Sequence, residues 1–438
     1  MSERGTVDVR ELIGSSRFGR VRIVGVLLCA VVVLFDGFDL QIIGLAAPSI
    51  AKTMNLPASA LGEVFSAAVA GLAAGSLALA PWSDRFGRKA VLVPAVVVFA
   101  MFTLATPAAG TLAPLLAYRF VTGLGLGAAV VCAVTLASEL VGPHRRGVIA
   151  GALYTGFPLG GVLAGLLGST LIAATGWQSL FIVGAVGPLV TAVLLIAVLP
   201  ESLTFLVGKQ APRERIRRTM ERIVPDAGVD PDRLFAERRV DGPGMQVGRL
   251  FTDGRRLATV LLWTVSFVAF GILVINSSWV PTLLAPVGLS VTRSALALAL
   301  FNAASMIATA AGGWLVARLG AGRVISTACV VAAVGLGGVG LVAPSALGVA
   351  AMEVLVGLGL GCASSGVIAL AAAAYPTALR STGLGWTLGL GRIGSFVGPL
   401  LIGTLATMAW RIAAIFGVLS AACLVGAVAA LALRTIAE

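Results

Sequence analysis

Asp36 and Asp39 lie three residues apart in a long apolar stretch, residues 21–49. In a helix this spacing puts both carboxyl groups on nearly the same face. An ionised carboxylate is costly away from water, so such a group tends to take up a proton and to have a function. We expect this pair to exchange protons. The alternative is that both side chains line a water-filled outer mouth.

Arg119 lies in another apolar stretch, residues 112–138, at a depth that matches the two aspartates. A guanidinium group beside a carboxyl group stabilises its charged form and promotes release of the proton. We therefore expect Arg119 to act with Asp36 and Asp39. A static ion pair that joins two helices is the alternative.

Arg392 lies about 12 residues, or roughly 18 Å, inside the stretch 381–408, which contains no acidic residue. Arginine keeps its proton, so at this depth it requires an anion, and a carboxylate can satisfy two of its donors at once. We expect Arg392 to bind a substrate carboxylate. The alternative is a structural pair with Glu353 in the stretch 347–373.

Aromatic side chains at similar depths could pack against a substrate ring. These candidates are Phe35, Phe38, Tyr154, Phe157, Phe301, Trp386 and Phe396. Asn302 is a further candidate, because a buried amide needs a hydrogen-bond partner and could bind a ring hydroxyl. For each aromatic residue, packing or lipid contact is the alternative.

The elements that carry these residues are membrane-spanning helices. Of the 438 residues 58% are hydrophobic and 11% charged, and the mean hydropathy is +1.02, whereas soluble domains are about 25% charged. Runs of about 20 apolar residues span the hydrocarbon core of a bilayer. Twelve such runs occur, at 21–49, 60–82, 90–107, 112–138, 147–174, 178–200, 256–283, 292–317, 323–343, 347–373, 381–408 and 411–433.

The charged residues predict which side of the membrane each loop faces. Of 31 Lys and Arg residues, 26 fall in segments on one side, three in loops on the other, and two within spans. This asymmetry predicts that both termini are cytoplasmic and explains the basic composition without nucleic acid. The expected parts are a cytoplasmic segment 1–20, a six-helix bundle 21–200, a cytoplasmic linker 201–255, a second bundle 256–433 and a tail 434–438. We see no removable signal peptide.

The residue types do not favour a metal site, a catalytic triad or a nucleotide site. The five cysteines lie within apolar runs without metal-ligand spacing, and the single histidine, His144, cannot build a zinc site or a conventional triad. The glycine-rich stretch 151–165 follows no strand and lacks a Walker lysine, so ATP is not expected as the energy source. We predict neither enzyme activity, nor a metal, nor a cofactor.

The two halves repeat. Arg119 to Gly127 matches Glu353 to Gly361, which is an offset of 234, and Pro48 matches Pro281 at nearly the same offset. Duplicated six-helix halves are typical of secondary transporters, which hold substrate between the repeats near the middle of the membrane.

Several motifs resemble a known family. Ser83-Asp-Arg-Phe-Gly-Arg-Lys89 and the repeated halves resemble the major facilitator superfamily over essentially the whole chain. Within it, four segments resemble the aromatic acid:proton symporter family: Asp36-Gly-Phe-Asp39, Leu199-Pro-Glu-Ser202, Tyr375-Pro-Thr-Ala-Leu-Arg-Ser-Thr-Gly383 and Gly391-Arg-Ile-Gly394. The resemblance implies an all-α membrane fold of twelve transmembrane helices in two six-helix repeats. It also implies a role in proton transfer for Arg119.

Charges beside the first motif are candidates for a gate. Asp84 could bind helix ends and arginines when the cytoplasmic side is shut and lose those contacts when it opens. Glu139 could pair with Arg88 or Arg145, and Arg85 belongs to the same group. For the charges at His144–Arg146, the alternative is that they only set the topology.

Together these observations predict a proton-coupled symporter that imports an aromatic carboxylate by alternating access. We expect it to be a monomer in the inner (plasma) membrane, driven by the proton gradient. Two alternatives stay open, a porter of another organic anion or of a sugar, and a membrane sensor that does not transport.

Overall fold

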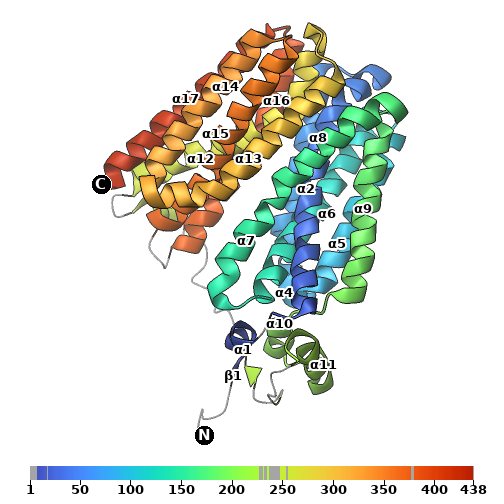
Figure 1. Cartoon of the computed structure of the whole chain (residues 1–438), viewed down its shortest axis with the longest axis vertical. Helices are drawn as coiled ribbons and strands as arrows, with labels where there is room; N and C mark the ends of the chain where they lie inside the picture. The colour runs from blue at the N-terminus through green and yellow to red at the C-terminus, as the bar shows by residue number, and fades with distance from the viewer. Residues whose placement is uncertain are drawn as a thin grey trace.

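The computed structural model describes residues 7–16, 18–225, 230, 234–235, 247–252, 255–375 and 379–437 (Figure 1). In that part of the chain twelve helices are long and apolar enough to cross a membrane, and they correspond one for one to the twelve expected runs. The expected fold class is therefore confirmed. The cytoplasmic location of the termini stays a prediction.

The spans are built from the following elements: α2 (Arg20–Met54), α3 (Ala58–Ala74) continued by a π-helix (Gly75–Leu79) and α4 (Trp82–Phe86), α5 (Arg88–Ala105), α6 (Leu112–Glu139), α7 (Arg146–Tyr154) with α8 (Gly156–Thr175), α9 (Gln178–Val198), α12 (Arg256–Leu284), α13 (Val291–Leu319), α14 (Ala321–Val342), α15 (Ala346–Ala374), α16 (Arg380–Thr407) and α17 (Ile412–Ala437). Short 3-10 turns lie at Thr106–Ala108, Pro143–Arg145, Val247–Phe251 and Ala285–Val287.

We call α2–α9 the N-half and α12–α17 the C-half. Two further helices, α10 (Leu203–Gly208) and α11 (Arg213–Ile223), lie between them in the sequence and beneath the N-half in Figure 1. We call the side of the molecule that carries α10 and α11 the linker side, and the other the opposite side.

The two halves touch closely on the opposite side, where glycines allow the backbones to approach. A Cβ atom at Gly44 of α2 would lie 2.6 Å from the carbonyl oxygen of Ser277 in α12. A Cβ atom at Gly62 of α3 would lie 2.7 Å from the carbonyl oxygen of Pro399 in α16. Small residues at helix interfaces are the usual route to such contacts in a membrane, where lipid provides no hydrophobic drive for helices to associate.

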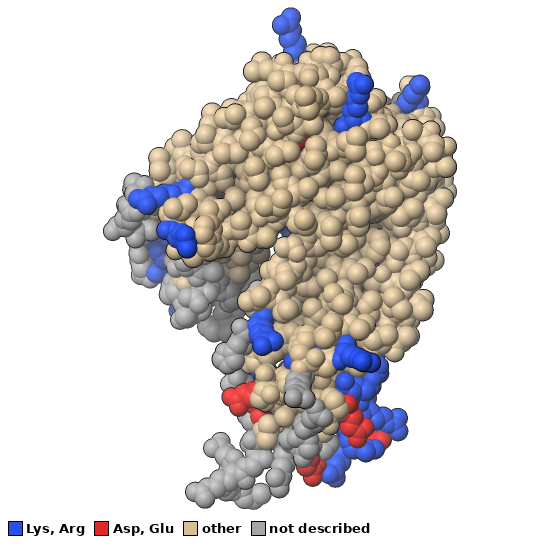
Figure 2. Space-filling view, in the orientation of Figure 1, with Lys and Arg blue, Asp and Glu red and all other residues tan. Residues whose placement is uncertain are grey.

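The buried apolar side chains show which side is closed. One cluster on the opposite side joins both halves and includes Leu45, Phe65, Trp279 and Leu298. On the linker side each half has its own cluster instead. The molecule is therefore closed on the opposite side and open toward the linker side, where Figure 2 shows the surface hollowed between the halves.

The amino-terminal segment folds against the linker, although only a polar segment was expected there. Helix α1 (Val9–Ser15) buries Val9, Leu12 and Ile13. Strand β1 (Val7–Asp8) pairs in parallel with β2 (Leu234–Phe235). The expected segment 1–20, linker 201–255 and tail 434–438 each include positions outside the described residues, so the division into these parts stays a prediction.

Candidate substrate and proton site

The Asp39 carboxylate is held by a dry, bidentate ion pair. Arg119 of α6 donates from Nη1 to Oδ1 at 3.0 Å and from Nη2 to Oδ2 at 2.5 Å. Thr103 of α5 donates to the same Oδ1 at 3.4 Å. Both partners are almost fully buried. Fork-shaped contacts of this kind are among the strongest charge pairs in proteins, so the pair fastens α2 to α6.

Asp36 lies one helical turn closer to the linker side and has different surroundings. The residue is half-buried, and the charged groups that act on its carboxyl group are Arg392 and Asp39. The sequence led us to expect Arg119 beside both aspartates. The structure instead gives Arg119 to Asp39 and leaves Asp36 facing the C-half.

Arg392 faces Asp36 from α16, and Tyr154 at the end of α7 completes the group. Tyr154 interacts electrostatically with both Arg392 and Asp36. Arg392 and Tyr154 are exposed, and each interacts with a charged group of the other half, so they face the opening between the halves. We call Asp36, Tyr154 and Arg392 the central cluster. Within the described residues, neither Asp36 nor Arg392 forms a hydrogen bond or an ion pair.

Glu353 does not pair with Arg392 in the part of the chain that is described. Its Oε2 accepts a hydrogen bond from the Asn276 side chain of α12 at 2.8 Å, and both residues are fully buried. This contact is the counterpart of the Arg119–Asp39 pair, since each joins the first and fourth spans of its half. Sequence reasoning missed Asn276, although a polar residue opposite the repeat partner of Arg119 was a usable signal.

Asn302 lies in the seam between the halves rather than in the central cluster. Its amide donates to the Leu298 carbonyl of its own helix at 2.8 Å, and its side chain fills the space left by Gly161 of α8. Phe38 and Phe301 belong to the apolar cluster that closes the opposite side. These positions favour packing.

The remaining aromatic candidates also contact protein. Phe35 packs on Gly187 of α9, and Trp386 stacks on Trp263 with ring centroids 5.8 Å apart. Phe157 offers its carbonyl group to the close contact with Gly37. The carbonyl of Phe396 accepts a hydrogen bond from Ser66 of α3 at 2.7 Å. Tyr154, by contrast, interacts electrostatically with Asp36 and Arg392.

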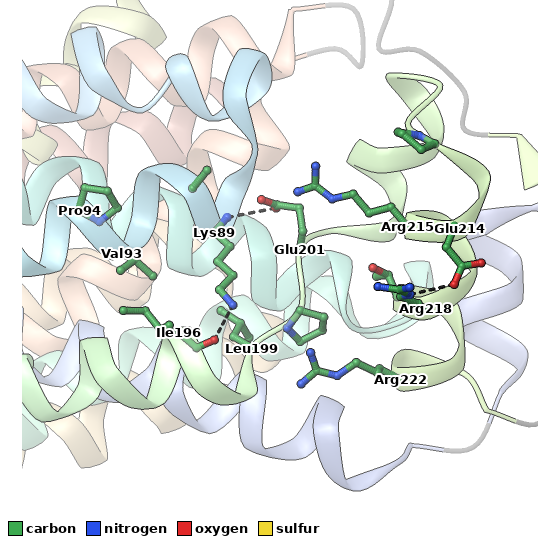
Figure 3. A pocket seen from close by; sticks show the side chains of 14 residues that line it. Lys89, Val93, Pro94, Ile196, Leu199, Glu201, Glu214, Arg215, Arg218 and Arg222 are labelled. Carbon is green, nitrogen blue, oxygen red and sulfur yellow. Dashed lines mark hydrogen bonds and ion pairs between the residues drawn. The ribbon is translucent and has the colours of Figure 1, made fainter.

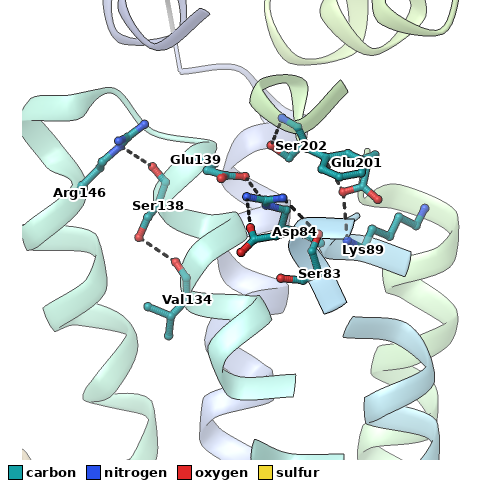
Figure 4. Close-up of polar contacts among 11 residues, drawn as sticks. Ser83, Asp84, Lys89, Val134, Ser138, Glu139, Arg146, Glu201 and Ser202 are labelled. Carbon is teal, nitrogen blue, oxygen red and sulfur yellow. Dashed lines mark hydrogen bonds and ion pairs between the residues drawn. The ribbon is translucent and has the colours of Figure 1, made fainter. Parts of the chain in front are cut away.

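A charged network lies at the linker side of the N-half (Figure 4). Arg88 contacts Asp84 at 2.8 Å and Glu139 at 3.3 Å, and donates to the Ser83 carbonyl at 3.1 Å. The Asp84 side chain is still 69% exposed. All of these contacts stay within one half, as expected where this side is open.

Other charges at this end have separate partners. Glu201 accepts hydrogen bonds from the backbone N–H groups of Lys89 and Ser202, at 3.1 and 2.9 Å. Arg85 lies over the Phe86 ring. Arg145 is near the like-charged Arg22 rather than Glu139.

Comparison with known proteins agrees with this architecture. The model of the Major Facilitator Superfamily matches residues 29–399 and 262–438. The 4-hydroxybenzoate transporter of Pseudomonas putida is 34% identical over 407 residues, covering 93% of this chain and 91% of the relative. The gallate transporter of the same species is 34% identical over 433 residues, covering 97% and 95%.

A solved structure of similar fold is the xylose transporter of E. coli in a partially occluded inward-open conformation. It has a TM-score of 0.74 at 15% identity, covering 96% of this chain and 98% of that one. The proteins named here are transporters, not enzymes. The twelve membrane-length helices and these matches make this chain a multi-pass membrane protein. This chain belongs to the Major Facilitator Superfamily.

Proposed function

We propose that the protein is a proton-coupled symporter that imports an aromatic carboxylate of the hydroxybenzoate type. The observation that carries this proposal is Arg392, a permanent cation at mid-membrane that faces the opening without a bonded counter-ion in the described chain. Beside it stand a carboxyl group, Asp36, and a phenol, Tyr154. The relatives named for 4-hydroxybenzoate and gallate handle ligands of this class.

The cluster offers a direct way to couple substrate to protons. A substrate carboxylate would accept two hydrogen bonds from Arg392, and the Tyr154 hydroxyl could bind the substrate as a third group. Asp36 would then stand near a second anion that shares the same cation. Two neighbouring carboxylates resist ionising together, so binding of the substrate anion favours protonated Asp36. Each substrate would thus enter with a proton, and no cofactor is required.

During transport the opposite side and the linker side would be closed in turn. In the present arrangement the seam around Gly44 and Gly62 is shut and the linker side is open. Movement of the halves in the opposite sense would bring the exposed carboxylate of Asp84 toward the C-half. The buried Asp39–Arg119 pair would keep α2 and α6 together during this movement, and it is the second site at which a proton could be held.

The same features support the proposed location, oligomeric state and substrate class. The charge asymmetry of the loops supports a plasma-membrane protein with both termini cytoplasmic. The central cluster is built from one chain, so a monomer suffices. Asn302, the amide expected to bind a substrate hydroxyl, is bonded to its own helix instead, and this disfavours a sugar.

Uptake of 4-hydroxybenzoate by the purified protein in liposomes tests the proposal. With an acidic exterior, we expect accumulation that an uncoupler abolishes. Excess unlabelled benzoate or gallate should compete, whereas 4-hydroxybenzamide and xylose should not. Accumulation that ignores the proton gradient, or competition by xylose alone, would overturn the proposal.

A further inference from the structure

A groove of about 790 Å³ lies on the linker side of the N-half, outside the central opening (Figure 3). It is bounded by the start of α5, the end of α9 and the exposed helix α11. The ends of two membrane-spanning helices form one wall, so the groove lies at the level of the lipid headgroups. It takes no part in the transport cycle described above.

One face of α11 makes the groove basic. Arg215, Arg218 and Arg222 are spaced to share a face of the helix, and all three line the groove opposite Lys89. Figure 3 shows Arg215 and Arg222 reaching from α11 into the groove, whereas Arg218 lies beside Glu214 of the same helix. Lys89 lies within electrostatic range of Arg222. The clustering of these cations favours an anion between them.

The two carboxylates that line the groove offset only part of this charge, because four basic residues line it. Hydrogen bonds from Arg217 and Arg218 lower the pKa of Glu214 to about 2, so Glu214 is satisfied by its own helix. Glu201 accepts two backbone N–H groups. Within the described chain, Lys89, Arg215 and Arg222 form no ion pair with a carboxylate. Lys89 and Arg222 donate instead to the carbonyl groups of Ile196 and Val198, at 2.8 and 2.9 Å.

The rest of the groove is apolar and continues onto the lipid-facing surface. Val93, Pro94 and Ile196 line it, and the Ile196 side chain is 57% exposed. The exposed residues Val190 and Val193 extend this surface along α9. A ligand that fills the groove therefore needs an anionic head and a hydrocarbon tail.

We propose that the groove binds one anionic phospholipid. Its phosphate lies between Lys89, Arg215 and Arg222, and an acyl chain runs over Val93 and Ile196. The bilayer supplies such a ligand at this depth, and the positive-inside charge pattern places the groove in the leaflet where basic residues meet anionic headgroups. The bound lipid would hold α11 against α5 and α9.

Native mass spectrometry of the full-length, delipidated protein titrated with phosphatidylglycerol tests this assignment. We expect one tight site that phosphatidylcholine with the same chains does not fill. Arg215→Gln/Arg222→Gln should weaken the site by about thirtyfold, since each basic residue near anionic lipid contributes about a factor of five. Arg20→Gln/Lys209→Gln removes the same charge from exposed residues of the linker side that do not line the groove, and it should leave the site intact.

Competition by a soluble anion and comparison of the two double variants distinguish a specific lipid site from other kinds of binding. If glycerol phosphate displaces the lipid, the groove binds a soluble anion. If both double variants lose lipid affinity equally, the lipid is held by diffuse electrostatic attraction. Either result would overturn the proposal. A co-purified protein bound in the groove would also overturn the lipid proposal. If the double variant melts lower than the parent in detergent, the single variant Arg215→Gln serves instead, because the Arg215 side chain forms no hydrogen bond or ion pair in the described structure. Its loss should be about fivefold. Lipid binding is read directly, so failure of the transport proposal would not affect this result.

Discussion

Gly44→Ala should disfavour the state that is closed on the opposite side. A Cβ atom at this position would lie 2.6 Å from the Ser277 carbonyl oxygen and 2.8 Å from the Ser278 Cα. Ordinary contacts begin near 3.5 Å, so α2 and α12 would have to separate by about 0.9 Å. Overpacking of this kind costs roughly 1–3 kcal/mol. Since only the closed seam bears that cost, its population should fall by a factor of roughly 5 to 150.

Spin labels on the opposite side can measure this shift. Lys52→Cys in α2 and Arg293→Cys in α13 are exposed positions, one in each half. In a background without the native cysteines, Gly44→Ala should increase the long-distance population and slow uptake. Gly389→Ala is the control, because a Cβ atom there would meet nothing within 4 Å. An unchanged distance distribution in a folded Gly44→Ala protein would refute the idea that this contact closes the seam.

Substitutions at three further positions test separate parts of the molecule. Asp36→Asn should abolish accumulation under a proton gradient but spare exchange of labelled for unlabelled substrate, because an amide cannot release a proton; accumulation like the parent's would contradict this. Asp84→Asn should leave substrate affinity, measured by calorimetry, within about threefold while transport slows at least tenfold, and the reverse pattern would place Asp84 in the binding site. Glu353→Gln should keep the contact with Asn276 and the melting temperature, whereas Glu353→Leu leaves a buried amide unpaired at about 1–3 kcal/mol and should melt several degrees lower. Equal melting of the last two variants would show that the contact does not stabilise the C-half.

The spans and the repeat could be predicted because bilayer thickness fixes the length of an apolar helix. Asp36 and Arg392 could also be identified from the sequence, because a charge inside the membrane is costly and usually has a function. Their mutual approach could not be predicted, because it depends on how the two halves dock. The offset of 234 between Arg119 and Glu353 did correctly indicate equivalent positions in the two halves.

The sequence does not show how each helix is rotated about its own axis, and this rotation decides which neighbours a side chain meets. Asp36 and Asp39 are separated by about 60° around the axis of α2, which is enough to give one a buried partner and the other an opening. Phe35 and Trp386 were placed at suitable depths but face neighbouring helices. The apolar spacing of Val9, Leu12 and Ile13 was a usable signal for α1, although charge dominates that segment.

The most direct test of substrate recognition is calorimetry of 4-hydroxybenzoate and 4-hydroxybenzamide against the parent protein and Arg392→Ala. If Arg392 binds the carboxylate, the parent should prefer the acid by well over tenfold, since a desolvated charge pair is worth about 2–5 kcal/mol when one partner is lost. Arg392→Lys should also bind the acid weakly, because it loses the planar fork. In Arg392→Ala the acid and the amide should bind about equally. If that variant keeps the parent's preference for the acid, the carboxylate is held elsewhere and the assignment of Arg392 is wrong.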